Sequence, residues 1–322
     1  MVKVAVVEGD GIGHEVVPVA RDILAAVRPD FEFFEVEVGY GLWERTGCAF
    51  GEETMAELRS ADVILFGAIT TPPDPDYRSV LLQIRHDLDL YANVRPIQGE
   101  GVDIVIVREN TEGLYSGIEW RGQDQACTVR VVTRSGSERI ARYACTLAKS
   151  RCHLTVGNKA NVLKSDCLFV EVCMAEAARA DVPCRTRYID ALSLDVLMHP
   201  ERYDVIVTTN IFGDILSDAA AYLVGGLGML PSANVGERHA LFEPVHGSAP
   251  DIAGKNLANP IAAIRSAAML LSHAGDPASA AAVEEAVSRV VDAGIRTPDL
   301  GGTAGTREFG AAVLREVKRS KA

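Results

Sequence analysis

Short apolar runs rich in β-branched residues alternate along the chain with longer segments of helical periodicity, and this alternation restricts the possible folds most. The runs predict buried strands at residues 2–7, 62–66, 103–107 and 204–209. Helical spacing of apolar residues covers 14–27, 52–59, 137–150, 165–180, 214–224, 260–274 and 277–293. Because continuous apolar strands must be covered on both faces, we predict an α/β fold with helices on either side of the strands.

Composition is that of a globular protein and excludes several classes of partner. The chain has 322 residues, roughly two domains' worth. Asp and Glu (44) outnumber Lys and Arg (32), for a formal charge of −12, so nucleic acid and anionic membranes are not expected partners. No run reaches about 18 apolar residues, and residues 2–7 are too few for a signal peptide. Seven cysteines without a C-x-x-C pair indicate reduced thiols, and we expect a soluble, cytoplasmic protein.

A glycine-rich segment, Glu8–Glu15, directly follows the first predicted strand. Its spacing, Gly9-x-Gly11-x-Gly13, differs from the G-x-G-x-x-G fingerprint of dinucleotide-binding turns. A tight turn between a strand and a helix also explains such glycines without any ligand. The segment alone therefore does not predict a cofactor site.

Two aspartates follow the predicted strand 204–209, at the strand end where open α/β sheets bind ligands. Asp214 and Asp218 are four residues apart, so on a helix both carboxylates project from one face. They repel each other unless a cation or a basic group lies between them, and Mg²⁺ or Mn²⁺ accepts such oxygen ligands. A solvated acidic helix face with an N-cap is the alternative.

Three arginines, Arg85, Arg95 and Arg108, lie near the ends of predicted elements. Arg108 ends the apolar run 103–107, where a guanidinium needs an anion and its planar fork suits a carboxylate. Beside a dicarboxylate metal site, the arginines predict a substrate with several carboxylates, unless they form three unrelated ion pairs. Lys159 and Tyr115 are available for proton transfer, although either also suits an ordinary surface or interface position.

Six longer motifs carry a family resemblance that spans nearly all of residues 1–310. They are Glu8–Glu15, Asp89–Pro96, Val107–Tyr115, Lys159–Val162, Asp204–Asp218 and Glu243–Gly254. With them the chain resembles the isocitrate/isopropylmalate dehydrogenases, a family of β-decarboxylating dehydrogenases. It is most similar to the archaeal-type 3-isopropylmalate and homoisocitrate dehydrogenases.

The resemblance implies a two-domain α/β/α sandwich that is not of the Rossmann type. The larger, cofactor-binding domain is expected to combine residues 1–95 and 240–322. Residues 96–239 are expected to form a smaller domain for substrate binding and dimerisation, with an arm near 116–135 that clasps a second subunit. A homodimer or higher even oligomer is therefore implied, with Tyr115 and the arginines from one subunit and Lys159 and Asp190 from the other.

The resemblance also implies roles for the residues of the site. Arg85, Arg95 and Arg108 are expected to bind the carboxylates of a 2-hydroxy di- or tricarboxylate. Asp190, Asp214 and Asp218 are expected to hold Mg²⁺ or Mn²⁺. Lys159 is expected to accept the hydroxyl proton, and Tyr115 to protonate the carbon that loses CO₂.

Two other members of the same fold are disfavoured by these residues. Non-catalytic regulatory subunits of the family are expected to lose the tyrosine, the lysine or a metal aspartate, all of which this chain keeps. Metal-dependent hydroxythreonine-phosphate dehydrogenases are expected to use histidine ligands, which the aspartate set lacks.

NAD is the expected cofactor because this chain has Asp251-Ile252 in the place where the resemblance implies Lys-Tyr for NADP-dependent relatives. A carboxylate at Asp251 would accept hydrogen bonds from ribose hydroxyls and repel a 2′-phosphate. The resemblance places the cofactor against nine residues in all: Thr70, Glu243, His246, Gly247, Ser248, Ala249, Asp251, Ile252 and Asn259.

Substrate identity depends on the segment 79–85, which in this family faces the variable group of the substrate. Ser79 is kept. The resemblance implies that isocitrate dehydrogenases carry an asparagine in the place of Leu81, and that some homoisocitrate enzymes carry an arginine in the place of Leu82. An apolar wall predicts 3-isopropylmalate, and hence a role in leucine biosynthesis. Arg78 and Thr70-Thr71-Pro72 keep homoisocitrate as the alternative, followed by isocitrate and D-malate.

Overall fold

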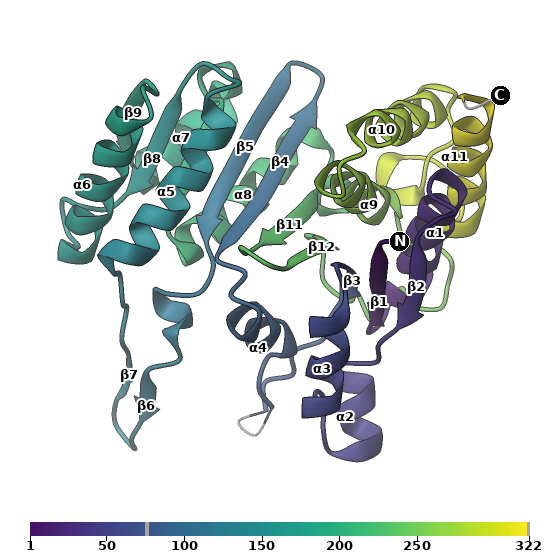
Figure 1. Ribbon diagram of the computed structural model, residues 1–322, viewed down its shortest axis with the longest axis horizontal. Coiled ribbons are helices and arrows are strands. Elements are labelled where there is room, and N and C mark those ends of the chain that lie inside the picture. The colour runs from purple at the N-terminus through teal and green to yellow at the C-terminus, as the bar shows by residue number, and fades with distance from the viewer. Residues whose placement is uncertain (75–76, 321–322) are drawn as a thin grey trace. The chain divides into compact units, whose positions relative to one another are not determined.

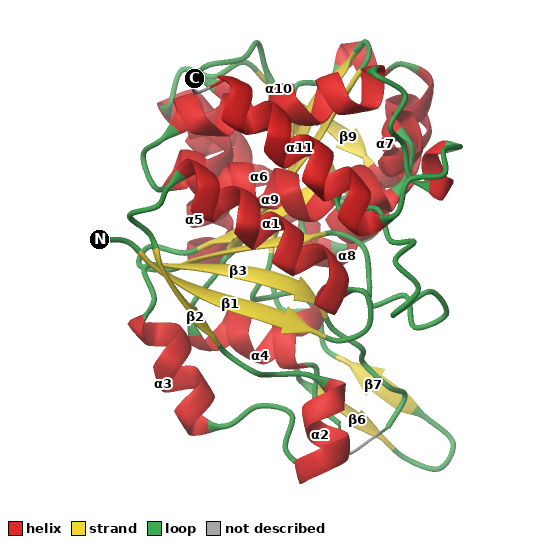
Figure 2. Cartoon of the chain, turned by 90° about the vertical axis from the view of Figure 1, so that its right-hand side faces the viewer, coloured by secondary structure: helices red, strands yellow, loops and turns green. Residues whose placement is uncertain are grey.

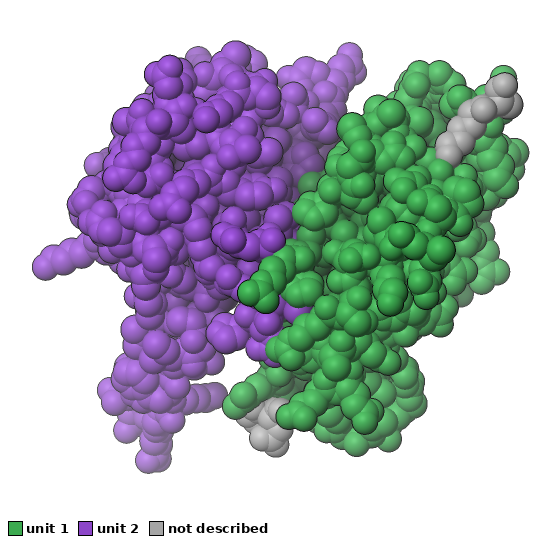
Figure 3. All heavy atoms as spheres, viewed as in Figure 1, with its two compact units in different colours: residues 1–84, 227–233, 238–322 green, residues 85–226, 234–237 purple. Residues whose placement is uncertain are grey.

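The computed structural model describes residues 1–74 and 77–320, and the chain forms two compact units (Figure 3). Unit 1 comprises Met1–Ile84, Leu227–Ala233 and Arg238–Ala322; unit 2 comprises Arg85–Gly226 and Asn234–Glu237. The chain passes between the units four times: within helix α4 (Val80–Asp87), after Gly226, within strand β11 (Pro231–Val235) and after Glu237. The division of cofactor and substrate binding between two domains stays a prediction.

Unit 1 contains four parallel strands in the order β2-β1-β3-β12. They are β1 (Lys3–Gly9), β2 (Glu32–Glu35), β3 (Val63–Ala68) and β12 (Ala240–Pro244). Every residue of β3 and β12 is buried, as continuous apolar strands require. Because these strands run in one direction, the loops that follow them lie at one edge of the sheet.

Helices cover both faces of the strands of unit 1. Besides the first residues of α4, the helices of the described part of unit 1 are α1 (Gly13–Val27), α2 (Tyr40–Thr46), α3 (Glu52–Ser60), α9 (Ile261–His273), α10 (Pro277–Asp292) and α11 (Thr306–Ser320), with short 3₁₀ turns at Leu227–Met229 and Pro298–Leu300. Figure 2 shows α1, α9 and α11 on one side of β1 and β3, and α3 on the other. Asp276 caps α10 by accepting a hydrogen bond from the Ser279 amide at 3.0 Å, and Pro277 suits the first helical position.

Unit 2 is built on five strands in the order β4-β5-β10-β8-β9. They are β4 (Ala92–Gly99), β5 (Val102–Glu109), β8 (Leu154–Asn158), β9 (Cys184–Tyr188) and β10 (Val205–Thr208). β4 and β5 form an antiparallel hairpin, whereas β5, β10, β8 and β9 are parallel. The carboxyl ends of β5, β8 and β10 therefore share one edge, where the predicted site residues follow.

Four helices flank these strands: α5 (Arg134–Ala148), α6 (Lys164–Arg179), α7 (Ile189–Met198) and α8 (Asn210–Ala220). Figure 1 shows α5 and α6 on one side of the unit 2 strands, and α7 and α8 on the other. Short 3₁₀ turns occur at Leu114–Ser116 (η1), Pro200–Arg202 (η2) and Ala221–Val224 (η3).

A separate two-stranded hairpin extends from unit 2 (Figure 1). It consists of β6 (Glu119–Arg121) and β7 (Ala126–Thr128), which pair in antiparallel register. Ile118 and Trp120 in this segment are 50% and 54% exposed. A hairpin with exposed large apolar side chains suits the arm expected near 116–135, but its contact with a second subunit stays a prediction.

The structure confirms the predicted α/β class and the main elements. Each of the four predicted strands and seven predicted helices corresponds to an observed element, with ends that move by a few residues. α5 begins at Arg134 rather than 137 because the Thr133 hydroxyl caps it by accepting from the Gly136 amide at 3.0 Å. The seven cysteines all lie in the described part and are free thiols. Within residues 1–74 and 77–320, no helix has both the length and the apolar character for crossing a membrane.

Candidate active site

Two buried guanidiniums meet at the end of the β4–β5 hairpin. The register pairs Asn93 of β4 with Arg108 of β5, and Arg108 is 1% exposed. The Asn93 side-chain oxygen accepts from Arg108 Nε at 2.8 Å and from Arg95 Nε at 2.9 Å. One amide oxygen therefore fixes both arginines, with their remaining N–H groups turned toward α8.

Helix α8 supplies the acidic partners of these arginines. Asp214 Oδ1 lies 3.0 Å from Arg95 Nη2 and 3.4 Å from Arg108 Nη2. Asp218 Oδ1 lies 3.0 Å from Arg95 Nη1, which also donates to the Ser217 hydroxyl at 2.6 Å. The predicted pair of carboxylates thus shares one face of one helix, and in this structure basic groups lie between them.

Tyr115 joins the same cluster from turn η1. Its hydroxyl donates to Asp214 Oδ2 at 3.1 Å, and the Arg108 guanidinium lies 6.0 Å from the ring centre. Burial raises the pKa of Tyr115 above its ordinary value, against the opposing charge of Arg108. The phenol is therefore neutral near pH 7 and holds a proton that it can deliver.

The electrostatics of the cluster favour binding of an anion beside a cation. Burial, together with the charge of Arg108, lowers the pKa of Arg95 to about 10, so that it stays protonated near neutrality. Burial acts to raise the pKa of Asp214, but the charges of Arg108 and Arg95 outweigh it and hold that pKa below its usual value. Burial raises the pKa of Asp218, against the charge of Arg95, and the charge of Asp214 adds to the increase. A further positive charge near Asp218, in addition to those of Arg95 and Arg108, would relieve this repulsion.

Arg85 contributes to the same field from the end of α4. It is 6% exposed, and its charge lowers the pKa of Asp214. Arg95 and Arg108 contact Asp214 directly, and Arg85 adds to the positive charge that acts on the same carboxylate.

Lys159 and Asp190 form a separate pair in unit 2. Lys159 follows β8, Asp190 lies in the first turn of α7, and Nζ to Oδ1 measures 2.7 Å. This hydrogen bond lowers the pKa of Asp190. Among the described residues, no three His, Cys, Asp or Glu side chains gather closely enough to hold a metal ion. The structure therefore does not bring Asp190, Asp214 and Asp218 together within one chain.

The donor chemistry of α8 nevertheless fits a divalent cation in part. Asp214 and Asp218 are 35% and 50% exposed, so solvent reaches both carboxylates, and both offer hard oxygen ligands. Two carboxylates leave room for further oxygen ligands from a substrate, water or another chain. Two of the three predicted metal ligands, Asp214 and Asp218, therefore fit a divalent cation at this place.

The predicted cofactor residues lie in unit 1, mostly after the strand ends of β3 and β12. The Thr70 hydroxyl donates to the Ser248 hydroxyl at 2.7 Å, which joins these two loops. Ala249 has a φ of 39°, an uncommon conformation for a residue with a Cβ. A Cβ placed on Gly247 would meet no atom within 4 Å, so the backbone is open to an approaching ligand there.

The other predicted cofactor residues differ in burial and in their hydrogen-bond partners. The partly buried His246 ring has a pKa lowered by burial, and its Nε2 has no hydrogen-bond partner within the described chain. Asn259 donates to Asp299 at 2.9 Å, while Glu243 is buried at the end of β12. Asp251 is exposed, and the ammonium of Lys255 donates to its carbonyl at 2.7 Å. Ile252 is partly buried in the same turn.

The predicted specificity residues lie at the start of α4. Ser79 precedes the helix and is partly exposed, as is Leu81. Leu82 is 36% exposed. The two leucines therefore offer apolar surface that no residue of the described chain covers fully.

Sequence reasoning missed the residues that hold the arginines in place, above all Asn93 and Ser217. Both are fully buried polar side chains within the motifs that carry the arginine and the aspartates. A polar residue inside an apolar strand such as β4 is the available signal, because a buried amide needs partners.

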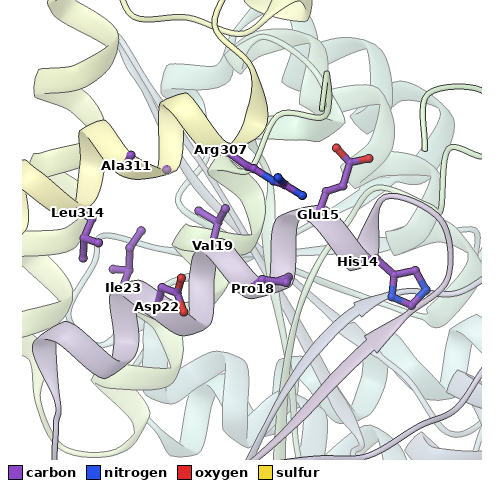
Figure 4. Close-up of a pocket in the computed structure, with 10 residues that line it drawn as sticks. His14, Glu15, Pro18, Val19, Asp22, Ile23, Arg307, Ala311 and Leu314 are labelled. Atoms are coloured by element: carbon purple, nitrogen blue, oxygen red, sulfur yellow. The ribbon is translucent and has the colours of Figure 1, made fainter. Parts of the chain in front are cut away.

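A cavity of about 370 Å³ lies elsewhere in unit 1, between α1 and α11 (Figure 4). Its floor is apolar, from Val19, Ile23 and Leu314, and charged groups such as Glu15 and Arg307 lie at its edge. None of its lining residues belongs to the predicted site.

Comparison with known proteins identifies the family. Residues 3–313 match the family described as isocitrate/isopropylmalate dehydrogenase. The chain is 49% identical to the 3-isopropylmalate dehydrogenase of Archaeoglobus fulgidus (96% of this chain, 97% of the relative) and 48% identical to the isocitrate/homoisocitrate dehydrogenase of Thermus thermophilus (98% of each). The crystal structure of isocitrate dehydrogenase from Methylococcus capsulatus matches with a TM-score of 0.95 at 43% identity, over 99% of this chain and 100% of that one. The chain therefore belongs to the isocitrate/isopropylmalate dehydrogenase family of β-decarboxylating dehydrogenases.

Proposed function

We propose that the chain catalyses the NAD-dependent oxidative decarboxylation of 3-isopropylmalate to 4-methyl-2-oxopentanoate. One hydride passes from C2 to NAD⁺, the hydroxyl gives up its proton, the bond to the β-carboxylate breaks to release CO₂, and the carbon left behind takes up a proton. The products are the 2-oxo acid, CO₂ and NADH. This reaction belongs to leucine biosynthesis.

The cluster of Arg95, Arg108, Asp214 and Tyr115 supports this reaction most directly. Two guanidiniums fixed by Asn93 supply N–H donors for the substrate carboxylates, and Arg85 adds a third positive charge. The neutral Tyr115 hydroxyl, 3.1 Å from Asp214, delivers the proton to carbon.

A divalent cation belongs to this proposal, held by Asp214 and Asp218 with Asp190 of a second copy. When bound, Mg²⁺ or Mn²⁺ supplies a Lewis acid that stabilises negative charge on the substrate oxygens. Arg95 and Arg108 lie 3.0–3.4 Å from these two aspartates and would hold their carboxylates in place for the ion.

Lys159 is proposed to accept the hydroxyl proton in a site shared between two copies. Lys159 pairs with Asp190, whereas Tyr115 pairs with Asp214. Because the proposed reaction needs all four residues at one substrate, these two separate pairs support a site to which one copy supplies the first pair and the other copy the second. The exposed hairpin β6–β7 offers a surface for the contact between copies. We therefore propose a homodimer or a higher even oligomer.

NAD is proposed to bind along the loops of unit 1 that Thr70 and Ser248 join. The unpartnered Nε2 of His246 and the open backbone at Gly247 support a ligand there. Asp251 carries the negative charge that disfavours a 2′-phosphate.

We expect kcat/KM for NAD to exceed that for NADP at least tenfold, about 1.4 kcal/mol. The physical reason is repulsion between Asp251 and the 2′-phosphate, although Lys255 at its carbonyl would offset part of it. Initial rates with both cofactors at one substrate concentration measure the ratio, and Asp251→Asn should lower it. Equal efficiency with the two cofactors in the unaltered enzyme would contradict the role of Asp251.

The apolar surface of Leu81 and Leu82 supports the isopropyl group as the variable part of the substrate. Burying an isopropyl group against them is worth about 2 kcal/mol. A carboxylate against the same two leucines would lose water without gaining a partner.

A homoisocitrate-type substrate is the second candidate, favoured by one observation. Arg78, next to Ser79, is exposed at the start of α4, where its charge is available to a distal carboxylate. Isocitrate and D-malate follow. Position 81 offers no asparagine or other polar group for the third carboxylate of isocitrate, and D-malate has no substituent that would bury the two leucines.

Side-by-side assays with 3-isopropylmalate, homoisocitrate, isocitrate and D-malate test the assignment. We expect kcat/KM to be highest for 3-isopropylmalate, and Leu82→Arg to lower it while raising that for homoisocitrate. Arg78→Gln is the matched variant: it should lower kcat/KM for homoisocitrate and leave kcat/KM for 3-isopropylmalate unchanged. A higher kcat/KM for homoisocitrate in the unaltered enzyme would overturn the apolar-wall argument.

A further inference from the structure

The glycine-rich segment Glu8–Glu15 lacks the spacing of a dinucleotide fingerprint, yet hydrogen bonds join it to each loop of the proposed cofactor site. The Ile12 amide donates to the Ser248 carbonyl at 2.9 Å. Glu15 accepts from the Gly254 amide at 2.7 Å. A Cβ on Gly11, whose φ is 57°, would lie 2.1 Å from the Ser248 carbonyl oxygen, so only glycine allows this approach.

Asp10 makes the most extensive of these connections. Its Oδ2 accepts from the amides of Thr70 and Tyr40, each at 2.9 Å, and its Oδ1 accepts from the Gly41 amide at 2.9 Å. The residue is 7% exposed. A Cβ on Gly39 would lie 2.7 Å from the same carboxylate, so the backbone closes tightly around it.

Three backbone donors on one buried carboxylate join segments that are far apart in the sequence. The start of α2 and the loop after β3 both depend on Asp10, and the Thr70 hydroxyl carries the connection on to Ser248 at 2.7 Å. Of the three donors to the Asp10 carboxylate, Thr70 is the proposed cofactor residue.

We propose that Asp10 is a positioning residue for the cofactor: it sets the Thr70 loop, and through Thr70 the Ser248 loop, in the conformation that binds NAD. This inference rests on the proposed function, since it assumes that these loops bind the dinucleotide. In this proposal Asp10 acts through the backbone amides that it binds, not as a ligand of the cofactor. Its charge matters because an asparagine has one oxygen for three donors, and its NH₂ group would face a backbone N–H.

The test is NADH binding to the full-length protein, followed by fluorescence, in the unaltered chain and in Asp10→Asn. We expect the dissociation constant to rise about tenfold in the variant. In turnover, KM for NAD should rise similarly, while kcat at saturating NAD and KM for the hydroxy acid stay within about twofold. A residue with a general structural role would change all of these quantities together.

Asp62→Asn is the matched control. Asp62 also accepts a backbone hydrogen bond, from the Lys3 amide at 2.8 Å, but at the opposite end of β1. The dissociation constant of the Asp62→Asn variant for NADH should equal that of the unaltered chain. Unchanged NADH binding in Asp10→Asn would overturn the positioning role while leaving the proposed function standing. An unaltered chain that does not bind NADH would overturn the proposed function first.

Hydrogen exchange in the unaltered protein tests the same connection if Asp10→Asn does not fold. NADH should slow exchange of the Thr70 amide and also of the Tyr40 and Gly41 amides, because all three donate to Asp10. Slower exchange at Thr70 alone would overturn the proposal.

Discussion

Replacing Asp214 with asparagine is expected to lower turnover by several orders of magnitude while the chain stays folded. The substitution keeps the shape of the side chain but removes the negative charge that Arg95, Arg108 and Tyr115 all contact. A cation at this site would lose one of its charged oxygen ligands. Initial rates across a range of Mg²⁺ concentrations measure the loss, and thermal unfolding shows whether the fold is kept.

Glu171→Gln is the matched control for Asp214→Asn. Glu171 also pairs with an arginine in unit 2, Arg134 at 2.8 Å, but both side chains are more than half exposed. Its removal should leave turnover and metal dependence unchanged, as expected for a surface ion pair. Treating the unaltered enzyme with EDTA should stop turnover, and added Mg²⁺ or Mn²⁺ should restore it. Full activity in the absence of divalent cations would show that Asp214 has another role.

The strongly apolar elements were predictable because burial on both faces leaves a continuous signal in the sequence. β3 and β10 show it, and α8 combined helical spacing with its two acidic residues. β9 was not predictable: its sequence is Cys-Arg-Thr-Arg-Tyr, and at the edge of the unit 2 strands three of these residues are exposed. An edge strand has one neighbour and needs no apolar run.

β11 was missed for a different reason. Its residues are all buried, but they include Pro231 and Asn234, which strands usually disfavour. Asn234 is satisfied from outside the strand, since its side-chain oxygen accepts from both Asn93 and Asn110 at 2.9 Å. Such partners come from distant parts of the sequence and leave no local pattern.

In the candidate site, too, some features were predictable from local sequence and others depend on distant parts of the chain. The residue types Arg, Asp and Tyr were predictable from the chemistry that their motifs require. The role of Asn93 was not, because it depends on the register that pairs it with Arg108 across the β4–β5 hairpin. Nor does any local pattern show that Lys159 pairs with Asp190 while Tyr115 pairs with Asp214. Position in space, rather than residue type, was the missing quantity.

That separation leads to a test with two inactive variants. Tyr115→Phe removes only the hydroxyl that donates to Asp214, and Lys159→Met removes only the ammonium that pairs with Asp190. Each variant alone should be nearly inactive, because each loses one proton-transfer group. If every site takes Tyr115 from one copy and Lys159 from the other, a mixed dimer contains one site with both groups intact.

Mixing equal amounts of the two variants should therefore restore about a quarter of the unaltered activity, because half of the dimers are mixed and half of their sites are complete. Tyr115→Phe mixed with Asp214→Asn is the matched control. These two residues contact each other within one chain, so no arrangement of copies gives a complete site and no activity should return. Native mass spectrometry of the mixtures shows whether subunits exchange. Mixed dimers without activity in the first experiment would mean that Lys159 acts in its own chain, and Lys159 would then have to reach Tyr115 by a movement within unit 2.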